Sequence, residues 1–230
     1  MLDALATAAR AFGVELNDTQ RAQFDRYRTE LLAWNERVNL TAIVDPGEVE
    51  TLHFADSLAC LLEPIESQAR LLDVGAGAGF PGLPLKIARP DLRLTLLEAT
   101  GKKARFLEHV AGVLGLDDVE VVNDRAETAP GREAFDLVVA RAVGALPVLL
   151  ELTLPFSRVG GRVLAMKKGP ALPAELGSAR HALNVLGGEL AAPRTYALAG
   201  ESRQIIVIAK VAATPSEYPR RSGMPAKHPL

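Results

Sequence analysis

The sequence contains one cysteine, Cys60, in 230 residues, which excludes an internal disulfide bond. No second cysteine and no histidine cluster accompanies it, so we assign no metal site and expect Cys60 to pack within a helix. No run approaches the roughly 20 apolar residues that cross a membrane. Residues 1–10 lack the basic and then apolar order of a secretion signal, so we expect a cytosolic protein.

The chain also lacks an excess of positive charge, since 26 lysines and arginines face 28 acidic residues. This balance excludes a uniformly basic nucleic-acid-binding protein, but the charges are unevenly distributed. Residues 1–60 contain five arginines and ten acidic residues, whereas residues 218–230 contain Arg220, Arg221 and Lys227 and no acidic residue. A polyanion could therefore contact one face, although charged runs are more often simply solvated surface.

The glycine-rich segment Leu71–Gly82, LLDVGAGAGFPG, is the most informative part of the chain. Its short apolar run predicts a buried parallel strand that leads through a turn into a helix. Gly75, Gly77 and Gly79 allow the backbone to approach a ligand where a Cβ atom would collide, and the first amides of the following helix face the same place. The segment predicts a nucleotide-like cofactor; the alternative is a glycine turn that binds no ligand.

The spacing of these glycines indicates which cofactor binds. A dinucleotide fingerprint has the pattern G-x-G-x-x-G directly after the strand, but its third glycine position, counted from Gly75, is Phe80. A later match that begins at Gly77 lies too far from the strand and is interrupted by Pro81. We therefore predict a mononucleoside with a small charged tail, S-adenosylmethionine, and disfavour a nicotinamide-dependent oxidoreductase.

From residue 70 onward, strand and helix patterns alternate, which is typical of a doubly wound α/β sheet. We predict the Rossmann-like fold of class I S-adenosylmethionine-dependent methyltransferases, with helices on both faces, an N-terminal helical cap and an antiparallel last strand. The expected strands cover 71–74, 93–97, 119–123, 136–140, 162–166, 194–198 and 204–210, with helices over 82–89, about 14 residues after Thr100, 146–155 and 172–186, and a turn at Gly160 and Gly161.

The N-terminal part is expected to be helical. After a helix over 2–12, Asn17 is a candidate helix cap with Gln20 three residues later, as in a capping box. Apolar residues then recur every three or four positions, which places them in the core rather than on an RNA-stacking surface. These residues are Phe24, Tyr27, Leu31, Trp34 and Val38. We divide the chain into a helical subdomain at 1–66, a methyltransferase domain at 67–211 and a basic, proline-rich, non-helical tail at 212–230.

The next predicted helix begins with Asp45 as its cap, Pro46 at its first position and Glu48 as a capping-box carboxylate. This helix carries His53 and Asp56 within one turn. A histidine and a carboxylate three positions apart could form an acid/base pair. The alternative is a structural hydrogen bond that joins this helix to the main domain.

Candidate site residues follow the predicted strands, because ligands of such sheets bind at the carboxyl ends of the strands. Glu98 ends the second strand, 23 positions beyond Gly75, where a ribose diol would find a hydrogen-bond acceptor. The segment 125–127 follows the third strand and is suited to reading an adenine edge. Arg141 and Lys167 follow the fourth and fifth strands, so we expect both to face the substrate.

The sequence disfavours two classes of nucleic-acid methyltransferase. Enzymes that act on exocyclic amines usually carry an Asn/Asp-Pro-Pro-aromatic motif after the fourth strand, where this chain has Ala140–Val143. Enzymes that act on C5 of pyrimidines need a nucleophilic cysteine near the cofactor, and Cys60 lies in the helical N-terminal part. An acceptor with a free lone pair, such as N7 of guanine, needs alignment rather than a base, although many small-molecule methyltransferases also lack a motif.

Longer phrases are spread over nearly the whole chain and are far more specific than the glycine loop alone. They are Trp34-Asn35, Asn39-Leu40-Thr41, His53-Phe54-Ala55-Asp56-Ser57, DVGAGAGFPGLPLKI from Asp73, Lys102-Lys103, Arg105-Phe106-Leu107, Arg125-Ala126-Glu127, Ala140-Arg141-Ala142, Met166-Lys167 and YPRRSGMPAKHPL from Tyr218. Together they resemble the bacterial RsmG (GidB) family, the 16S ribosomal RNA guanine-N7 methyltransferases.

The resemblance implies methyl transfer from S-adenosylmethionine to N7 of the family's target, guanosine 527 of 16S rRNA, in the small ribosomal subunit or an assembly intermediate. We expect a monomer, with Arg141 and Lys167 as catalytic residues. The predicted cofactor contacts are Asp73, Gly75, Gly77, Phe80, Glu98, Ala99, Thr100, Ala126, Glu127 and Arg141. The predicted RNA contacts are Lys102, Lys103, Arg105, Lys167, Arg220 and Arg221.

Two departures from the family pattern restrict these assignments. The family often has Glu-Arg-His before its last strand, where this chain has Glu201-Ser202-Arg203-Gln204, so Arg203 receives no role. Lys168 follows Lys167, which leaves open which of the two amines points into the site. The rival functions are a small-molecule methyltransferase, a nicotinamide oxidoreductase and a non-catalytic RNA-binding or assembly factor that retains the fold.

Overall fold

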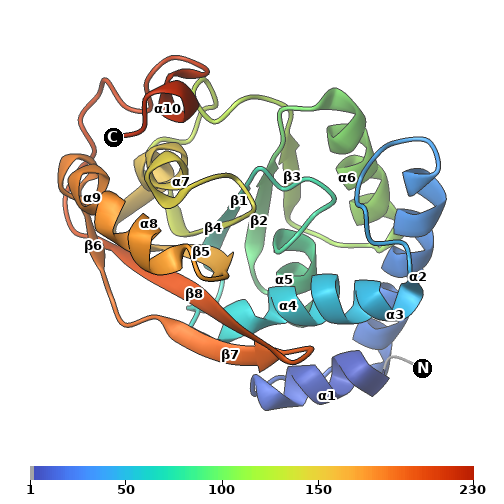
Figure 1. Cartoon of the computed structure of the whole chain (residues 1–230). Helices are drawn as coiled ribbons and strands as arrows, with labels where there is room; N and C mark the ends of the chain where they lie inside the picture. The colour runs from blue at the N-terminus through green and yellow to red at the C-terminus, as the bar shows by residue number, and fades with distance from the viewer. Residues whose placement is uncertain (1–2) are drawn as a thin grey trace.

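The computed structural model describes residues 3–230, which form an eight-stranded sheet with helices on both faces (Figure 1). The strand order is β3-β2-β1-β4-β5-β8-β6, and β7 also pairs with β8. The five strands from β3 to β5 are parallel, and β8 is antiparallel to β5, which confirms the predicted α/β sheet and its antiparallel last strand. The strands are β1 (Arg70–Val74), β2 (Arg93–Leu97), β3 (Val119–Val122), β4 (Phe135–Arg141), β5 (Ser157–Lys168), β6 (Gly188–Leu190), β7 (Arg194–Leu198) and β8 (Glu201–Lys210).

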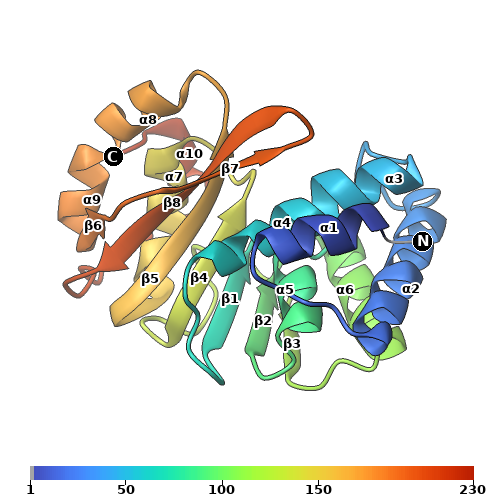
Figure 2. The same ribbon diagram turned by 90° about the horizontal axis from the view of Figure 1, so that it is seen from below.

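Two layers of helices enclose the sheet, as Figure 2 shows. One layer contains α1 (Asp3–Ala11), α2 (Asp18–Asn35), α5 (Gly82–Ala88) and α6 (Gly101–Val113), together with the short helices α3 (Pro46–Glu48), α4 (Asp56–Leu58) and η2 (Ala59–Leu62). The other layer contains α7 (Leu146–Thr153), η3 (Leu154–Phe156), α8 (Leu172–Ser178) and α9 (Arg180–Leu186). No helix of residues 3–230 combines the length and apolar character needed to cross a bilayer.

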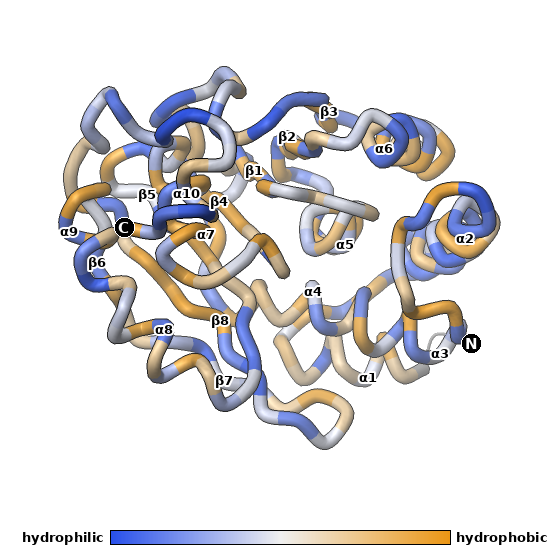
Figure 3. The backbone as a smooth tube through the Cα atoms, turned by 45° about the horizontal axis from the view of Figure 1, so that its top comes forward, coloured by the Kyte–Doolittle hydropathy of each residue, from blue (hydrophilic) through white to orange (hydrophobic). Residues whose placement is uncertain are grey.

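Strand side chains alternate between two hydrophobic cores. Leu71 and Val139 pack into the core that contains α1, α2, α5 and α6, whereas Leu72 and Val138 pack into the core that contains α7 and α9. Successive residues of a strand point to opposite faces, so both faces of these strands are apolar. Figure 3 shows hydrophobic colour on the central strands and mixed colour along α2 and α6.

The N-terminal helices form as their caps predict. Asn17 Oδ1 accepts from the Gln20 amide and Gln20 Oε1 accepts from the Asn17 amide, both at 2.9 Å, which confirms the capping box. The Gln20 side chain also donates to the Ile87 carbonyl at 2.8 Å and so fixes α2 to α5. Of the predicted apolar stripe, Phe24, Tyr27 and Leu31 are fully buried, and the remaining two residues are partly buried.

The segment after Asp45 differs from a regular α-helix. Asp45 accepts from the Gly47 and Glu48 amides at 2.9 Å, as predicted for a cap, but Glu48 completes no capping box within the described chain. The helix then continues as the π-helix η1 (Val49–Ala55) before α4 begins at Asp56. Such wider turns are frequent at functional sites, and this one carries His53.

The secondary structure differs from the prediction in three places. The expected turn at Gly160 and Gly161 lies inside β5, where the strand bulges between the pairs Phe135–Ser157 and Leu137–Arg162. A Cβ atom on Gly161 would lie 2.9 Å from the Asp136 carbonyl oxygen, so the glycine permits close pairing rather than a turn. The single helix expected over 172–186 is divided at Ala179 into α8 and α9, and the three-residue strand β6 was not predicted.

The C-terminal tail is ordered against the second helical layer. It contains the short helix α10 (Met224–Lys227), so the prediction of a tail without helix was wrong. The Arg132 guanidinium donates to the Pro215 carbonyl at 2.8 Å and also to the carbonyls of Thr214 and Tyr218. These hydrogen bonds fix the chain as it leaves β8, and Figure 1 shows the tail beside α7.

Candidate functional site

The glycine loop joins β1 to α5 at the carboxyl edge of the sheet. Gly75, Gly77 and Gly79 have φ angles of +69°, +60° and +97°, which residues with a Cβ atom rarely adopt. A Cβ atom on Gly79 would collide with Leu83, so this glycine is required for packing. A Cβ atom on Gly77 would meet only the Gly75 carbonyl, at 3.8 Å. Gly77 therefore borders open space at the edge where a cofactor is predicted.

Glu98 follows β2 and lies against this loop. Its Oε2 accepts from the Gly77 amide at 2.9 Å, and its Oε1 accepts from the Thr100 amide at 2.8 Å. Its carbonyl accepts from Asn123 Nδ2 at 2.7 Å, which ties the ends of β2 and β3 together. Ala99 and Thr100 are exposed beside it. The structure thus brings the predicted ribose acceptor to the glycine loop.

Asp73 is fully buried in β1 next to the loop. Its Oδ2 accepts from the Gly82 amide at 2.7 Å, but its Oδ1 has no hydrogen-bond partner among residues 3–230. Burial raises the pKa of Asp73 to about 7 because the charged carboxylate loses its hydration. An unpartnered buried carboxylate oxygen is stabilised by a cationic ligand group. The ammonium and sulfonium of S-adenosylmethionine, together with ribose hydroxyls for Glu98, fit these residues.

The predicted adenine side lies after β3 and is covered by the tail. Ala126 is half-buried and packs against the core that contains α7. Glu127 Oε1 accepts from the Gly223 amide at 3.1 Å. The C-terminal segment therefore lies against the turn that we predict to contact the adenine.

Phe80 is buried in an aromatic stack. Its ring stacks with the rings of Tyr27 and His53, at centroid distances of 5.5 and 4.4 Å. The guanidinium carbon of Arg141 lies 4.9 Å from the Phe80 ring centroid, within the range of a cation–π interaction. The predicted cofactor residue Phe80 thus supports Arg141 directly.

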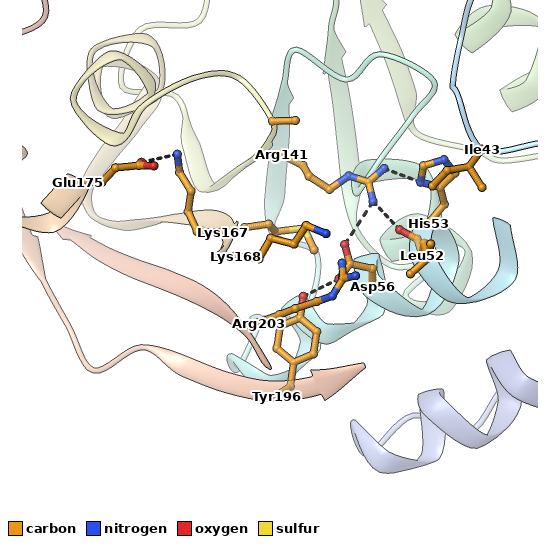
Figure 4. Close-up of a pocket in the computed structure, with 12 residues that line it drawn as sticks. Ile43, Leu52, His53, Asp56, Arg141, Lys167, Lys168, Glu175, Tyr196 and Arg203 are labelled. Carbon is orange, nitrogen blue, oxygen red and sulfur yellow. Dashed lines mark hydrogen bonds and ion pairs between the residues drawn. The ribbon is translucent and has the colours of Figure 1, made fainter. Parts of the chain in front are cut away.

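Arg141, the last residue of β4, is held by the N-terminal helices. Its Nη1 donates to the Leu52 carbonyl at 3.1 Å and lies 3.4 Å from Asp56 Oδ2, and its Nη2 lies 3.1 Å from His53 Nδ1 (Figure 4). These contacts fix the guanidinium at the carboxyl edge of the sheet. The helical N-terminal part therefore contributes directly to the site.

His53 and Asp56 bind Arg141 rather than each other. Burial and the neighbouring Arg141 charge lower the pKa of His53 to about 4, so the imidazole is neutral. Its Nδ1 accepts from Arg141, which places the proton on Nε2 for the hydrogen bond to Thr41 Oγ1 at 2.8 Å. The structure favours the structural alternative, in which these residues join the helical part to the sheet.

A pocket of about 460 Å³ opens beside Arg141. Lys167 and Lys168 both line it but point in different directions, as Figure 4 shows. Lys167 Nζ donates to Glu175 at 2.7 Å, and its side chain is 13% exposed. Lys168 Nζ pairs with Glu201 at 3.2 Å, and its side chain is 58% exposed. Lys167 is therefore the lysine fixed in the pocket wall.

Three polar residues that line this pocket received no role from the sequence. Arg203 Nη1 donates to Asp56 Oδ1 at 3.0 Å, and Tyr196 donates to the same oxygen at 2.7 Å. Glu175 reaches the pocket from α8. A buried arginine in the apolar pattern of β8 was a possible signal for Arg203, but no motif distinguishes Glu175 or Tyr196.

Apart from Lys167, which lines the pocket, the predicted RNA-binding residues fall into two groups. Lys102, Lys103 and Arg105 lie at the start of α6, exposed or half-exposed, on the same edge of the sheet as the glycine loop. Arg221 is exposed, but Arg220 is engaged with the fully buried Glu151, at 2.6 Å for the shorter of its side-chain hydrogen bonds. Arg220 therefore fixes the tail to α7.

A family model and a curated relative that match this chain carry the same description. The GidB family model, described as rRNA small subunit methyltransferase G, matches residues 20–206. The chain is 49% identical over 234 aligned positions, covering all of both chains, to the Ribosomal RNA small subunit methyltransferase G of Roseiflexus castenholzii.

Two solved structures share the fold at low sequence identity. A SAM dependent methyltransferase from Aquifex aeolicus has a TM-score of 0.53 at 17% identity, covering 71% of this chain and 93% of that chain. The 16S rRNA (adenine(1408)-N(1))-methyltransferase from Catenulisporales acidiphilia has a TM-score of 0.54 at 15% identity, covering 65% and 88%. These likenesses confirm the predicted class I methyltransferase fold.

Proposed function

The chain belongs to the GidB family, that of rRNA small subunit methyltransferase G, and from this membership we propose that it methylates N7 of guanosine 527 in 16S rRNA. The methyl donor is S-adenosylmethionine, and the substrate is the small ribosomal subunit or an assembly intermediate. The observation that supports this function best is the position of Arg141. Its guanidinium lies over Phe80 of the glycine loop and lines the pocket, so it joins the cofactor side to an adjacent cavity.

Methylation at N7 uses a lone pair that guanine already carries. The N–C bond forms as the C–S bond breaks and its electron pair stays on sulfur, so the base gains a positive charge and loses no proton. A general base is then unnecessary, which agrees with the hydrogen bonds beside the pocket: the basic Nδ1 of His53 already accepts from Arg141, and Asp56 already accepts from its donors. Alignment of the reacting atoms supplies the rate enhancement.

The residues of the glycine-loop side have separate roles in this proposal. When bound, S-adenosylmethionine supplies an electrophilic methyl group on a cationic sulfur. Asp73, whose Oδ1 accepts no hydrogen bond from residues 3–230, would ionise beside the cationic end of the cofactor and pair with it. Glu98 provides acceptors for the ribose hydroxyls, and Ala126 and Glu127 border the adenine.

RNA binding is proposed along the same edge of the sheet. In this proposal the phosphates are contacted by Lys102, Lys103, Arg105 and Arg221, whose side chains are exposed or half-exposed. Phosphate contacts give affinity without sequence preference. Arg220 contributes indirectly, since its contacts with Glu151 hold the tail in place. Guanosine 527 must leave its surroundings to enter the pocket, as in other enzymes that act on a base.

The test uses small ribosomal subunits from a strain that lacks this gene, incubated with the purified protein and methyl-labelled S-adenosylmethionine. We expect label in N7-methylguanosine at position 527. Arg141→Ala should lower kcat/KM at least roughly 100-fold, because the guanidinium contacts the reacting base. Asp56 keeps Arg203 and Tyr196 as donors in this variant, so the fold should survive.

Two results would contradict the proposal. Binding of the particles without transfer of label to any rRNA would indicate an assembly factor. Turnover of a small molecule, with no label in rRNA, would indicate a small-molecule methyltransferase.

A further inference from the structure

Lys167 and Glu175 form a fixed ion pair in the wall of the pocket. Lys167 Nζ donates to Glu175 Oε2 at 2.7 Å and to the Gly144 carbonyl at 2.6 Å. Glu175 Oε2 also accepts from the Leu146 amide at 2.9 Å, at the first position of α7. The pair therefore joins β5, α8 and the loop that follows β4, and its geometry is set before any ligand arrives.

One oxygen of this pair remains free for a ligand. Glu175 Oε1 accepts no hydrogen bond from residues 3–230, and the Glu175 side chain is 26% exposed. The other carboxylate that lines the pocket, Asp56, is already occupied by Tyr196, Arg203 and Arg141. Glu175 is thus the carboxylate of the pocket that can accept a hydrogen bond from a base.

The pair presents a donor next to an acceptor, and guanine has the complementary edge. The Watson–Crick edge of guanine offers the O6 acceptor, then the N1–H donor, then the exocyclic amine donor. Adenine offers an amine donor and then an N1 acceptor. Its amine would face the Lys167 ammonium, donor against donor, and its N1 would face the Glu175 carboxylate, acceptor against acceptor. The Lys167 ammonium matches O6, and the Glu175 carboxylate matches N1–H and the exocyclic amine.

We propose, on the basis of the function above, that the Lys167–Glu175 pair reads the target base as guanine, in the way that cytosine does in a base pair. Glu175 is then a specificity-determining residue. It also acts on the reaction itself, because methylation at N7 makes the ring cationic and its N1–H and amine stronger donors. The hydrogen bonds to the carboxylate therefore strengthen toward the transition state.

Inosine tests the proposal, because it lacks only the exocyclic amine of guanine. The substrates are small subunits reconstituted from 16S rRNA ligated with a synthetic segment that carries guanosine or inosine at the target position. Wild-type protein should prefer guanosine by roughly 10- to 100-fold in kcat/KM, the effect of losing one charge-assisted hydrogen bond.

In Glu175→Gln the amide oxygen stays with its donors Lys167 and Leu146, so the amide NH₂ faces the amine of guanine. We expect the preference for guanosine to fall to about threefold or less, with the larger loss of activity on guanosine. Glu189→Gln is the matched control, since Glu189 is an exposed carboxylate of β6 that does not line the pocket. This control should keep the wild-type preference.

The outcomes separate the inference from the proposed function. An unchanged ratio of guanosine to inosine in Glu175→Gln overturns the role of Glu175 even when the particles are methylated. Absence of methylation of the guanosine particles by wild-type protein overturns the function itself. Calorimetric binding of S-adenosylhomocysteine to both variants shows whether each is folded. Glu175→Asp shortens the side chain by one methylene and provides a second measurement of the guanosine-to-inosine ratio.

Discussion

At the scale of single residues, Asp73 and His53 give the protein opposing pH dependences. The folded protein holds a proton on Asp73 up to about pH 7, whereas an unfolded aspartate releases it near roughly pH 4. Folding therefore takes up a proton in this window, and the free energy of unfolding falls as the pH rises. The lowered pKa of His53 acts in the opposite direction, since the unfolded chain binds the extra proton between about pH 4 and 6.5.

Asp73→Asn isolates the first contribution. Asparagine keeps an acceptor for the Gly82 amide but does not titrate, so we expect the stability of the variant relative to wild type to increase from about pH 4 to above pH 7. Urea denaturation of both proteins across this range measures the difference. Calorimetry should also show S-adenosylmethionine binding weakened about tenfold or more, because a charged partner is lost. Stability curves that remain parallel would contradict the raised pKa.

The residues that sequence could identify are those whose position follows from the chain alone. Gly75 and Glu98 come directly after strands and Arg141 is the last residue of one, and the carboxyl ends of parallel strands meet at one edge. Arg203 and Asp56 are 147 positions apart, so their pairing depends on how β8 packs against the N-terminal helices. Glu175 belongs to no motif, and only its hydrogen bonds to Leu146 and Lys167 identify it as a residue of the pocket wall.

At the scale of secondary-structure elements, the centres of strands and helices were predictable and several ends were not. The apolar runs of β1, β2, β4 and β8 gave their positions because both faces of these strands are buried. The extra length of β5 depends on pairing of Ser157 with Phe135 across a bulge, which is a tertiary contact. The break at Ala179 and the strand β6 likewise depend on packing against neighbouring elements.

The tail element can be tested through Arg220 and Glu151. Arg220→Ala leaves the fully buried Glu151 without its charged partner, so we expect a loss of about 2–4 kcal/mol in the free energy of unfolding. Urea denaturation measures it, and Arg221→Ala, at an exposed position, should change stability by less than about 0.5 kcal/mol. Adding Glu151→Gln to Arg220→Ala should recover much of the loss. Equal stability of the two single variants would show that the tail is not anchored by this pair.

At the scale of the whole molecule, the net charge of −2 conceals a separation of charge. The lysines and arginine at the start of α6 lie at the carboxyl edge of the sheet, whereas acidic residues predominate over residues 1–60. A protein of this kind approaches a polyanion in a preferred orientation, because its charges produce an uneven field. The net charge calculated from the sequence does not indicate this orientation.

Replacement of Lys102, Lys103 and Arg105 by alanine should weaken binding to small-subunit rRNA and reduce its dependence on salt. If all three contact phosphates, the slope of log K against log salt should decrease in magnitude by about 2, since each single-strand contact contributes about 0.7. Fluorescence titrations at several salt concentrations measure the slope. Arg93→Ala, at an exposed position at the amino end of β2, is the control and should leave it unchanged. A triple variant with the wild-type slope would exclude this surface from RNA binding.

Asp56 accepts hydrogen bonds from Arg203 and from Arg141, which belong to different strands. A substitution at either arginine alters the charge balance experienced by the other, so their effects cannot combine as independent losses. We therefore expect substitutions at these two positions to be epistatic during evolution. The effect of replacing one arginine should depend on whether the other arginine and Asp56 are present.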